Sequence, residues 1–153
     1  MKPILSIIIP AYNAAHYIKR CLDSIFVNGG LDKTSLDLIE TIVVDDCSKD
    51  NTSTIVEKYR DTYNMSNLRL IRHNKNLQQG AARNTGLKKA CGKYIWFVDV
   101  DDIIMPGFLS ILQHPNFLSD IDVFQFNAIA EDLNGNQIAE EFLQEAITAV
   151  SGI

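Results

Sequence analysis

The stretch from residue 94 to residue 106 constrains the fold most, because an apolar run there changes abruptly into a cluster of carboxylates. Residues 94–98 (YIWFV) form a short aromatic and β-branched run, which predicts a central strand covered on both faces. Asp99, Asp101 and Asp102 follow directly. Carboxylates this close repel one another, so the cluster predicts either a solvated acidic turn or a cation site.

A cation bound by these carboxylates would be Mg²⁺ or Mn²⁺, because both ions prefer hard oxygen ligands. Such ions bind through one or two carboxylates and complete their coordination with water and substrate phosphates. The two interpretations of the cluster are equally good on the cluster alone. What decides between them is which other polar residues reach the same edge of the fold.

A β-branched run predicts a buried strand at residues 4–9, which Pro10 is expected to end. Further strands are predicted at residues 38–44, 68–71 and 123–129. An amphipathic helix is predicted after the first strand, with Asn13 as its cap. Its inner face has the spacing i, i+3, i+4, i+7, i+8, in Ile18, Cys21, Leu22, Ile25 and Phe26.

Further helices are predicted between the later strands. Asp50 or Asn51 can cap a helix whose inner face is formed by Ile55, Val56 and Tyr59. Residues 81–90 are predicted as the next helix, and Gly92 is expected to close it in a left-handed conformation. Pro106 suits the first position of a short helix.

The C-terminal part of the chain carries a hairpin signal. Asn134-Gly135 is the strongest turn pair in the sequence, and it predicts that the strand over residues 123–129 turns back through residues 137–139. Residues 140–150 are predicted as a helix.

Strands that alternate with helices predict a three-layer α/β/α sandwich around a mostly parallel sheet with right-handed crossovers. In such a sheet the carboxyl ends of the parallel strands lie at one edge, where ligands bind. This rule brings together Tyr12 and Asn13, Asp45 and Asp46, and the aspartates of residues 99–102. Polar residues from three strand ends at one edge favour the cation site over the solvated turn.

With 153 residues, the chain is expected to form a single domain. Its formal net charge of −5 argues against a nucleic-acid partner. Cys21, Cys47 and Cys91 are odd in number and lack metal-ligand spacing, which predicts free thiols in a reducing compartment. No apolar run reaches the length of a membrane span, so we expect a cytoplasmic protein, with peripheral association at the inner face of the membrane left open.

The glycine-rich nucleotide-binding motifs, G-x-G-x-x-G and the P-loop, are absent from the sequence. Four other segments stand out: residues 6–13 (SIIIPAYN), 43–52 (VVDDCSKDNT), 80–86 (GAARNTG) and 94–102 (YIWFVDVDD). Together, and in this order, they resemble the motifs of the family 2 glycosyltransferases, which have the Rossmann-like GT-A fold. The resemblance implies metal-dependent, inverting transfer from a nucleotide diphosphate sugar, with a uridine diphosphate sugar as the expected donor, in polysaccharide or cell-surface glycan synthesis.

The resemblance also implies roles for individual residues. Tyr12, with the backbone around Ala11, would pack on the nucleobase, and Asp46 would accept a hydrogen bond from a uracil-like ring nitrogen. Asp102 would be the chief ligand of Mn²⁺ or Mg²⁺. The full nucleotide-sugar set is Pro10, Ala11, Tyr12, Asn13, Asp46, Arg83 and Asp101, and the metal set is Asp99, Asp101 and Asp102.

Several of these positions have simpler interpretations. Asp45 is expected only to cap a helix or to bond backbone amides. Arg83 could instead pair with a surface carboxylate, and Asp99 could orient the loop without touching metal. Trp96 and Phe97 are predicted as core residues, and the scattered His16, His73 and His114 as surface or packing residues.

The resembled family uses an acceptor-side carboxylate as general base, beyond the nucleotide-binding half. The later candidates in this chain, none of them in a matched motif, are Glu131, Asp132, Glu140 and Glu141. We therefore expect the base to lie beyond Ile153. Residues 1–153 would then be a single GT-A domain without the acceptor-binding part, which binds the donor and Mn²⁺ but transfers poorly to a glycan or lipid-linked acceptor.

Two other functions fit parts of the pattern. A receiver domain also binds Mg²⁺ through an acidic pair and a separate Asp, but its pair should follow the first strand, whereas Asp45-Asp46 follows the second. A non-catalytic nucleotide-sugar-binding module is the other alternative. Labelling by acetyl phosphate would identify a receiver, and metal-dependent donor hydrolysis would identify an enzyme.

Overall fold

The computed structural model describes residues 2–113, 128–131 and 137–141. The chain divides into two compact units, Met1–His114 and Pro115–Ile153. The elements of the first unit are β1 (Leu5–Ala11), α1 (Ile18–Phe26), the 3₁₀ helix η1 (Leu36–Leu38), β2 (Ile39–Asp45), α2 (Thr52–Tyr63), β3 (Leu68–Arg72), α3 (Gln78–Leu87), β4 (Tyr94–Phe97) and the 3₁₀ helix η2 (Phe108–Gln113). Those of the second are β5 (Ala128–Glu131) and β6 (Gln137–Glu141).

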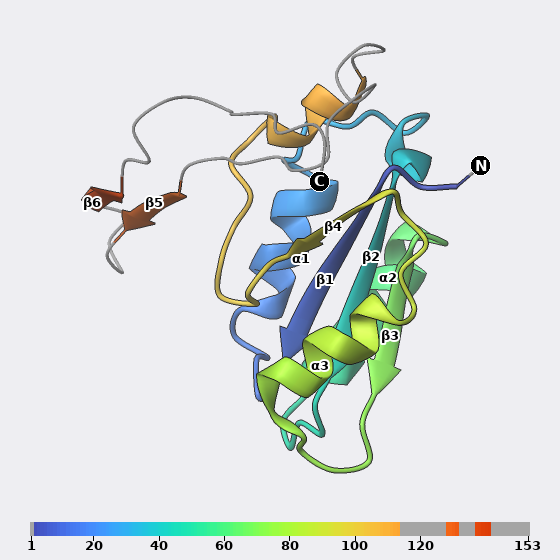
Figure 1. The fold of residues 1–153 in the computed structure, drawn as a ribbon, viewed down its shortest axis with the longest axis vertical. Coiled ribbons are helices and arrows are strands. Elements are labelled where there is room, and N and C mark those ends of the chain that lie inside the picture. Colours follow the sequence, from blue (N-terminus) through green and yellow to red (C-terminus); the bar gives the residue numbers. More distant parts are fainter. Residues whose placement is uncertain (1, 114–127, 132–136, 142–153) are drawn as a thin grey trace, which may run out of the picture. The chain divides into compact units, whose positions relative to one another are not determined.

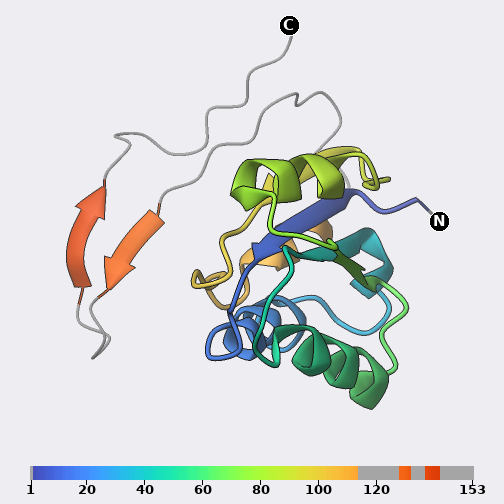
Figure 2. The same ribbon diagram turned by 90° about the horizontal axis from the view of Figure 1, so that it is seen from below.

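Parallel strands form the sheet of the first unit, in the order β3-β2-β1-β4. The helix α3 covers one face of this sheet, and α1 and α2 cover the other, so the unit has three layers (Figures 1 and 2). The predicted α/β/α architecture around a parallel sheet is confirmed. Because the strands all run the same way, their carboxyl ends lie at one edge.

The strands β1 and β2 form the centre of the core, since every residue of both is buried. On the α3 face, Ile42 and Val44 belong to one apolar cluster with Ala82. The helix approaches β1 closely at Gly86, where an added Cβ atom would collide with the side chain of Ile8. The glycine at this position therefore lets the helix lie directly on the sheet.

The first strand continues through Pro10 to Ala11, so the prediction that Pro10 ends it is wrong. Two residues before the proline, the carbonyl of Ile8 accepts a hydrogen bond from the N–H of Val98 at 3.0 Å. The backbone groups of every second residue point to the same side, so Pro10 also faces the side of β4. The strand β4 itself ends at Phe97. Among the described residues, no strand therefore faces the position where Pro10 lacks an N–H, and the proline costs no ladder bond.

The two predicted helix caps have different outcomes. Asn13 has a φ of 50°, and its side-chain oxygen accepts the N–H of Lys49 at 2.8 Å, while α1 begins only at Ile18. Asn13 is therefore not the cap of α1, and that prediction is wrong. The N-cap position of α2 is Asn51, whose side chain makes no capping hydrogen bond, and the preceding Asp50 accepts the N–H of Thr52 on its Oδ1 at 3.0 Å. Of the two predicted candidates, Asn51 thus has the position and Asp50 has the hydrogen bond.

The later helices are shifted from their predicted bounds. The helix α3 spans residues 78–87 rather than 81–90. Gly92 is not among the residues with positive φ, so it does not close α3 in a left-handed conformation. A side chain does not fit at Gly92, because an added Cβ atom would lie only 2.6 Å from the backbone nitrogen of Ser6. The short helix near Pro106 is η2, which begins after the proline, at Phe108.

The strand β4 is where predicted, but among the described residues it is the edge of the sheet and not a central strand. Ile95 and Phe97 lie on the same face of the sheet as α3, but this helix packs on β1 and β2. The two side chains are 36% and 40% exposed. Trp96 lies on the opposite face and packs against Phe108, with ring centroids 5.6 Å apart. The prediction of Phe97 as a core residue is therefore wrong.

In the second unit, β5 and β6 pair antiparallel, which confirms the predicted hairpin. Glu140 and Glu141 belong to β6, so the prediction that a helix starts there is wrong. The Asn134-Gly135 turn, residues 123–127, residues 142–150 and Asp132 lie outside the described residues.

Candidate functional site

The segments that follow the parallel strands are joined side by side at the carboxyl edge of the sheet (Figure 1). The N–H of Asp46, after β2, donates to the carbonyl of Ala11 at the end of β1, at 2.8 Å. The N–H of His73, after β3, donates to the carbonyl of Asp45 at 2.9 Å. The segment after β4 begins with Val98 and Asp99. The polar residues predicted to gather at this edge therefore do lie on it.

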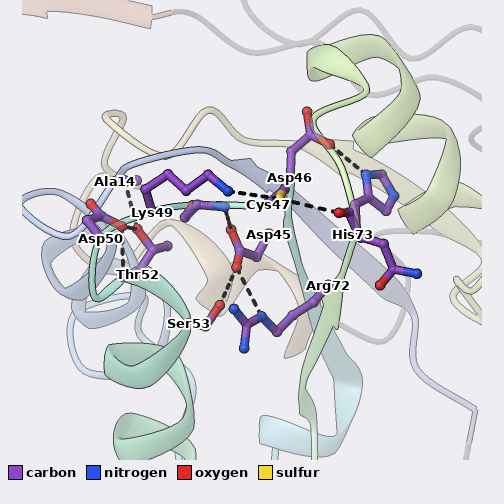
Figure 3. Close-up of polar contacts among 12 residues, drawn as sticks. Ala14, Asp45, Asp46, Cys47, Lys49, Asp50, Thr52, Ser53, Arg72 and His73 are labelled. Atoms are coloured by element: carbon purple, nitrogen blue, oxygen red, sulfur yellow. Dashed lines mark hydrogen bonds and ion pairs between the residues drawn. The ribbon is translucent and has the colours of Figure 1, made fainter.

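Asp45 is a wholly buried carboxylate with a structural set of partners (Figure 3). Its Oδ1 accepts the N–H of Ser48 at 2.9 Å, and its Oδ2 accepts the hydroxyl of Ser53. Arg72 brings its Nε to 3.3 Å from the same Oδ2. Both oxygens are occupied from within the protein, which agrees with the interpretation of Asp45 as a residue that bonds backbone and neighbouring side chains.

Asp46, the next residue, is also buried, but it turns toward a different set of groups (Figure 3). Its Oδ1 lies 2.7 Å from Nδ1 of His73 and accepts the N–H of Leu77 at 2.9 Å. Burial by itself disfavours the charged form, but the hydrogen bonds from Leu77 and His73 outweigh it and hold the pKa of Asp46 below its ordinary value. Asp46 is therefore a carboxylate at neutral pH.

The loop after β1 is fastened to the loop before α2 by a set of hydrogen bonds, which we call the two-loop clasp. The N–H of Asn13 donates to the hydroxyl of Ser48 at 2.9 Å, and the N–H of Ala14 donates to that of Thr52 at 2.8 Å. The N–H of Ala15 donates to Asp50 at 2.9 Å. Tyr12, at the start of this loop, has a side chain that is 48% exposed and so is free to contact a ligand.

The first carboxylate after β4 is held by α3. Asp99 Oδ1 accepts a hydrogen bond from Nη2 of Arg83 at 2.6 Å and another from Nε2 of Gln79 at 2.9 Å. The guanidinium of Arg83 also lies 5.9 Å from the centre of the Phe97 ring. Arg83 thus pairs with a carboxylate, and Asp99 anchors the loop, as the simpler interpretation of each residue expects.

The next two carboxylates, Asp101 and Asp102, are exposed. Arg20, on α1, donates from Nη2 to the backbone carbonyl of Asp101 at 3.1 Å, so the loop is held from both sides of the sheet. Loss of hydration raises the pKa of Asp102, and the charges of Asp101 and then Asp99 raise it further. The carboxylates of this loop are thus close enough to repel one another, and a nearby cation would relieve that repulsion.

In the part of the chain that the structure describes, no three His, Cys, Asp or Glu side chains form a ready-made metal cage. Asp99 already has its Oδ1 engaged by Arg83. Asp101 and Asp102 nevertheless fit the binding mode of Mg²⁺ or Mn²⁺ in which one or two carboxylates are supplemented by water and phosphate oxygens. The pKa of Asp102 is raised first by loss of hydration and then by the charges of Asp101 and Asp99, and a cation bound here would offset the repulsion between these carboxylates.

Three residues of this edge were missed from the sequence: His73, Gln79 and Arg20. His73 lies two residues after the predicted strand 68–71, so its place at the carboxyl edge could have been inferred from the sequence. Gln79 and Arg20 carry no such signal, because their contacts join residues 20 and 81 positions apart in the chain. The prediction of free thiols is confirmed, since all three cysteines are unpaired.

Comparison with solved structures agrees with the Rossmann-like GT-A fold expected from the four motifs. The mannosyltransferase PcManGT from Pyrobaculum calidifontis, in complex with GDP-Man and Mn²⁺, aligns with a TM-score of 0.66 and 27% identity, over 81% of this chain and 34% of that one. Residues 1–349 of TarS from S. aureus, in complex with UDP, align with a TM-score of 0.61 and 40% identity, over 72% of this chain and 30% of that one.

Comparison with sequences assigns the family. The profile of glycosyl transferase family 2 matches residues 6–146, and the chain therefore belongs to this family. One relative is the uncharacterized glycosyltransferase YibD of Escherichia coli K12, which is 36% identical over 124 residues. That alignment covers 81% of this chain and 33% of YibD, so the chain spans about a third of the length of this relative. No helix among the described residues is long and apolar enough to cross a membrane.

Proposed function

We propose that the chain is the donor-binding part of a metal-dependent glycosyltransferase that uses a nucleotide diphosphate sugar, with a uridine diphosphate sugar as the preferred donor. The single observation that carries this proposal is that the carboxyl edge of the sheet holds both a buried carboxylate and a loop of exposed carboxylates. The buried, ionised Asp46 is joined through its N–H to Ala11, the residue before the exposed Tyr12, and a loop of mutually repelling carboxylates follows the strand on the other side of β1.

The nucleobase is proposed to bind at the ends of β1 and β2. The exposed ring of Tyr12 offers an apolar face for stacking, and Asp46 offers an acceptor for a ring N–H. The backbone from Pro10 to Asn13 lines this side, and its position is fixed by the two-loop clasp. The UDP bound to TarS supports a uridine donor, and the GDP-Man bound to PcManGT supports a nucleotide sugar in general.

The diphosphate is proposed to lie over the loop after β4. Asp102, assisted by Asp101, would hold Mn²⁺ or Mg²⁺, and Asp101 would also reach the ribose or the sugar. Asp99 is proposed as an outer member of the metal set, and Arg83 as a cation that reaches toward the phosphates. A divalent ion bound here supplies charge neutralisation and Lewis-acid stabilisation of the departing diphosphate. The Mn²⁺ in the PcManGT complex supports metal use.

The complete reaction is proposed to be an inverting transfer. An acceptor hydroxyl attacks the anomeric carbon, the bond from that carbon to the diphosphate oxygen breaks, and a carboxylate takes the hydroxyl proton. The acceptor is proposed to be a glycan or lipid-linked glycan, handled in the cytoplasm at the inner face of the membrane.

Calorimetric titration tests the donor proposal. We expect UDP and UDP-sugars to bind in Mn²⁺ buffer, and binding to weaken at least about tenfold when the metal is removed by chelation. Absence of heat with every nucleotide, in a sample shown to be folded, would contradict the proposal. Slow metal-dependent hydrolysis of the donor would separate an enzyme from a non-catalytic binding module, and stable labelling by acetyl phosphate would instead identify a receiver domain.

A further inference from the structure

His73 lies where three elements of the carboxyl edge meet. It follows β3, its Nδ1 is 2.7 Å from Oδ1 of Asp46 after β2, and its Nε2 is 2.9 Å from the hydroxyl of Thr85 on α3. Its side chain is only 9% exposed, and that of Asp46 is 4% exposed (Figure 3). Both ring nitrogens are therefore engaged, which fixes the plane and the position of the imidazole.

The partners of the ring decide where its protons lie. A carboxylate can only accept a hydrogen bond, so Nδ1 of His73 must carry the hydrogen that faces Asp46. In the neutral ring Nε2 is then an acceptor, and the hydroxyl of Thr85 donates to it. The direction of donation runs from Thr85 through His73 to Asp46.

This arrangement makes the two oxygens of Asp46 unequal. Oδ1 receives both His73 and the N–H of Leu77 at 2.9 Å, whereas Oδ2 receives the longer bond from Leu77, at 3.1 Å. A carboxylate oxygen has two acceptor positions, so Oδ2 retains capacity for a further donor. That donor can come from a ligand that reaches the end of β2.

We propose that His73 is a positioning residue for nucleobase recognition, which holds Asp46 with Oδ2 available to a ring N–H and thereby sets the preference for uracil over cytosine. The inference rests on the proposed function, since it assumes that the nucleobase binds beside Asp46. Uracil presents an N–H at ring position 3, and cytosine presents a lone pair there. A fixed carboxylate therefore accepts from the first and repels the second.

Two substitutions separate this role from mere packing. His73→Leu fills similar space but offers no donor to Asp46. His73→Asn places an amide N–H near the position of Nδ1, so it can still donate to Asp46 although it cannot reach Thr85. A packing role predicts that the leucine is the better replacement, and a positioning role predicts that the asparagine is.

The experiment measures UDP, CDP and pyrophosphate binding by calorimetry in Mn²⁺ buffer for the full chain and both variants. His73→Leu is expected to weaken UDP by about tenfold and to reduce the UDP-to-CDP affinity ratio by a similar factor, with pyrophosphate unchanged. His73→Asn is expected to recover most of that ratio. An unaltered ratio in His73→Leu, or an equal loss for pyrophosphate, would overturn the inference. Failure of the parent chain to bind UDP would instead count against the proposed function.

A second measurement needs neither variant nor nucleotide. Nitrogen-15 NMR of the histidine rings in the free parent chain is expected to find His73 protonated at Nδ1. A separate binding test uses the variant Thr85→Val, which removes one hydroxyl from a half-buried position. This variant is expected to keep its fold and to bind UDP about threefold more weakly. A neutral His73 ring protonated at Nε2 alone would contradict the proposed direction of donation and overturn the inference, whatever the variants do.

Discussion

The carboxylates after β2 and those after β4 differ in how their charge is compensated. Asp45 and Asp46 are buried, and hydrogen bonds from serine, arginine, histidine and backbone groups stabilise both. Asp101 and Asp102 are exposed, and the pKa of Asp102 is raised by loss of hydration and by its acidic neighbours. The first pair is held by contacts within the protein, whereas the second consists of exposed carboxylates that repel one another. The proposed nucleobase site and the proposed metal site thus lie at different strand ends of one sheet edge.

The largest expected effect tests the loop after β4. Asp102→Asn is expected to abolish Mn²⁺-dependent UDP binding, with a loss of about a hundredfold or more, because the chief proposed metal ligand is removed. The same change is expected to raise the free energy of unfolding slightly at neutral pH, because it removes a charge that its neighbours repel. Calorimetry and urea unfolding measure the two quantities.

The matched control for this change is Asp61→Asn, which alters an exposed carboxylate on α2 paired only with its neighbour Arg60. It is expected to change neither metal-dependent binding nor stability by a measurable amount. If Asp102→Asn unfolded more easily than the parent but still bound UDP with Mn²⁺, Asp102 would be a structural residue and not the proposed metal ligand.

A smaller effect is expected after β2. Asp45→Asn is expected to lower the free energy of unfolding by about 2 kcal/mol, because Ser48, Ser53 and Arg72 lose a buried charged acceptor. Urea denaturation measures this change. Pyrophosphate binding in Mn²⁺ buffer is expected to persist where the variant is folded. A variant as stable as the parent would show that the buried carboxylate is not the structural anchor of this loop.

The smallest effect concerns pH. The folded-state pKa of Asp46 is lowered, so its stabilisation is present above the ordinary carboxyl pKa and is lost as pH falls through the folded value. The pKa of Asp102 is raised, so its charge destabilises the fold above the folded value, and this penalty disappears as pH falls. Asp46→Asn is therefore expected to be less stable than the parent at pH 7, and Asp102→Asn more stable.

Both differences between variant and parent are expected to shrink in acid, below about pH 4, as urea unfolding at several pH values would measure. If both variants were less stable than the parent at neutral pH, or both more stable, the proposed difference between Asp46 and Asp102 would be contradicted.

The layers of the fold were predictable because each strand and helix carries its own local pattern. Short, mostly apolar segments marked β1 to β4, and the topology rule then placed Asp46 and Asp102 on the same edge without knowledge of any contact. The errors arose where a distant neighbour decides the outcome. Pro10 is tolerated in β1 because β4 has already ended, and Phe97 is exposed because α3 covers only the two central strands on that face.

The candidate site was predictable as a set of carboxylates but not as a network. The place of Asp46 at this edge could be predicted from the sequence. Its pairing with His73 could not, because a single sequence does not say which two strand ends exchange side-chain hydrogen bonds. The pairing of Arg83 with Asp99 was open for the same reason, although each residue had a pairing or anchoring role among its alternatives.

The two-loop clasp has a consequence for distant substitutions. The main-chain N–H groups of residues 13–15 are bound by the side chains of Ser48, Asp50 and Thr52, so the turn that carries Tyr12 has no independent freedom to reposition its ring. The position of the Tyr12 ring, which we propose to stack on the nucleobase, therefore depends on the loop before α2 and on the first residue of that helix. If Tyr12 stacks on a nucleobase as proposed, replacing Thr52 by a residue without a hydroxyl would change that stacking indirectly, through the loss of its hydrogen bond to Ala14.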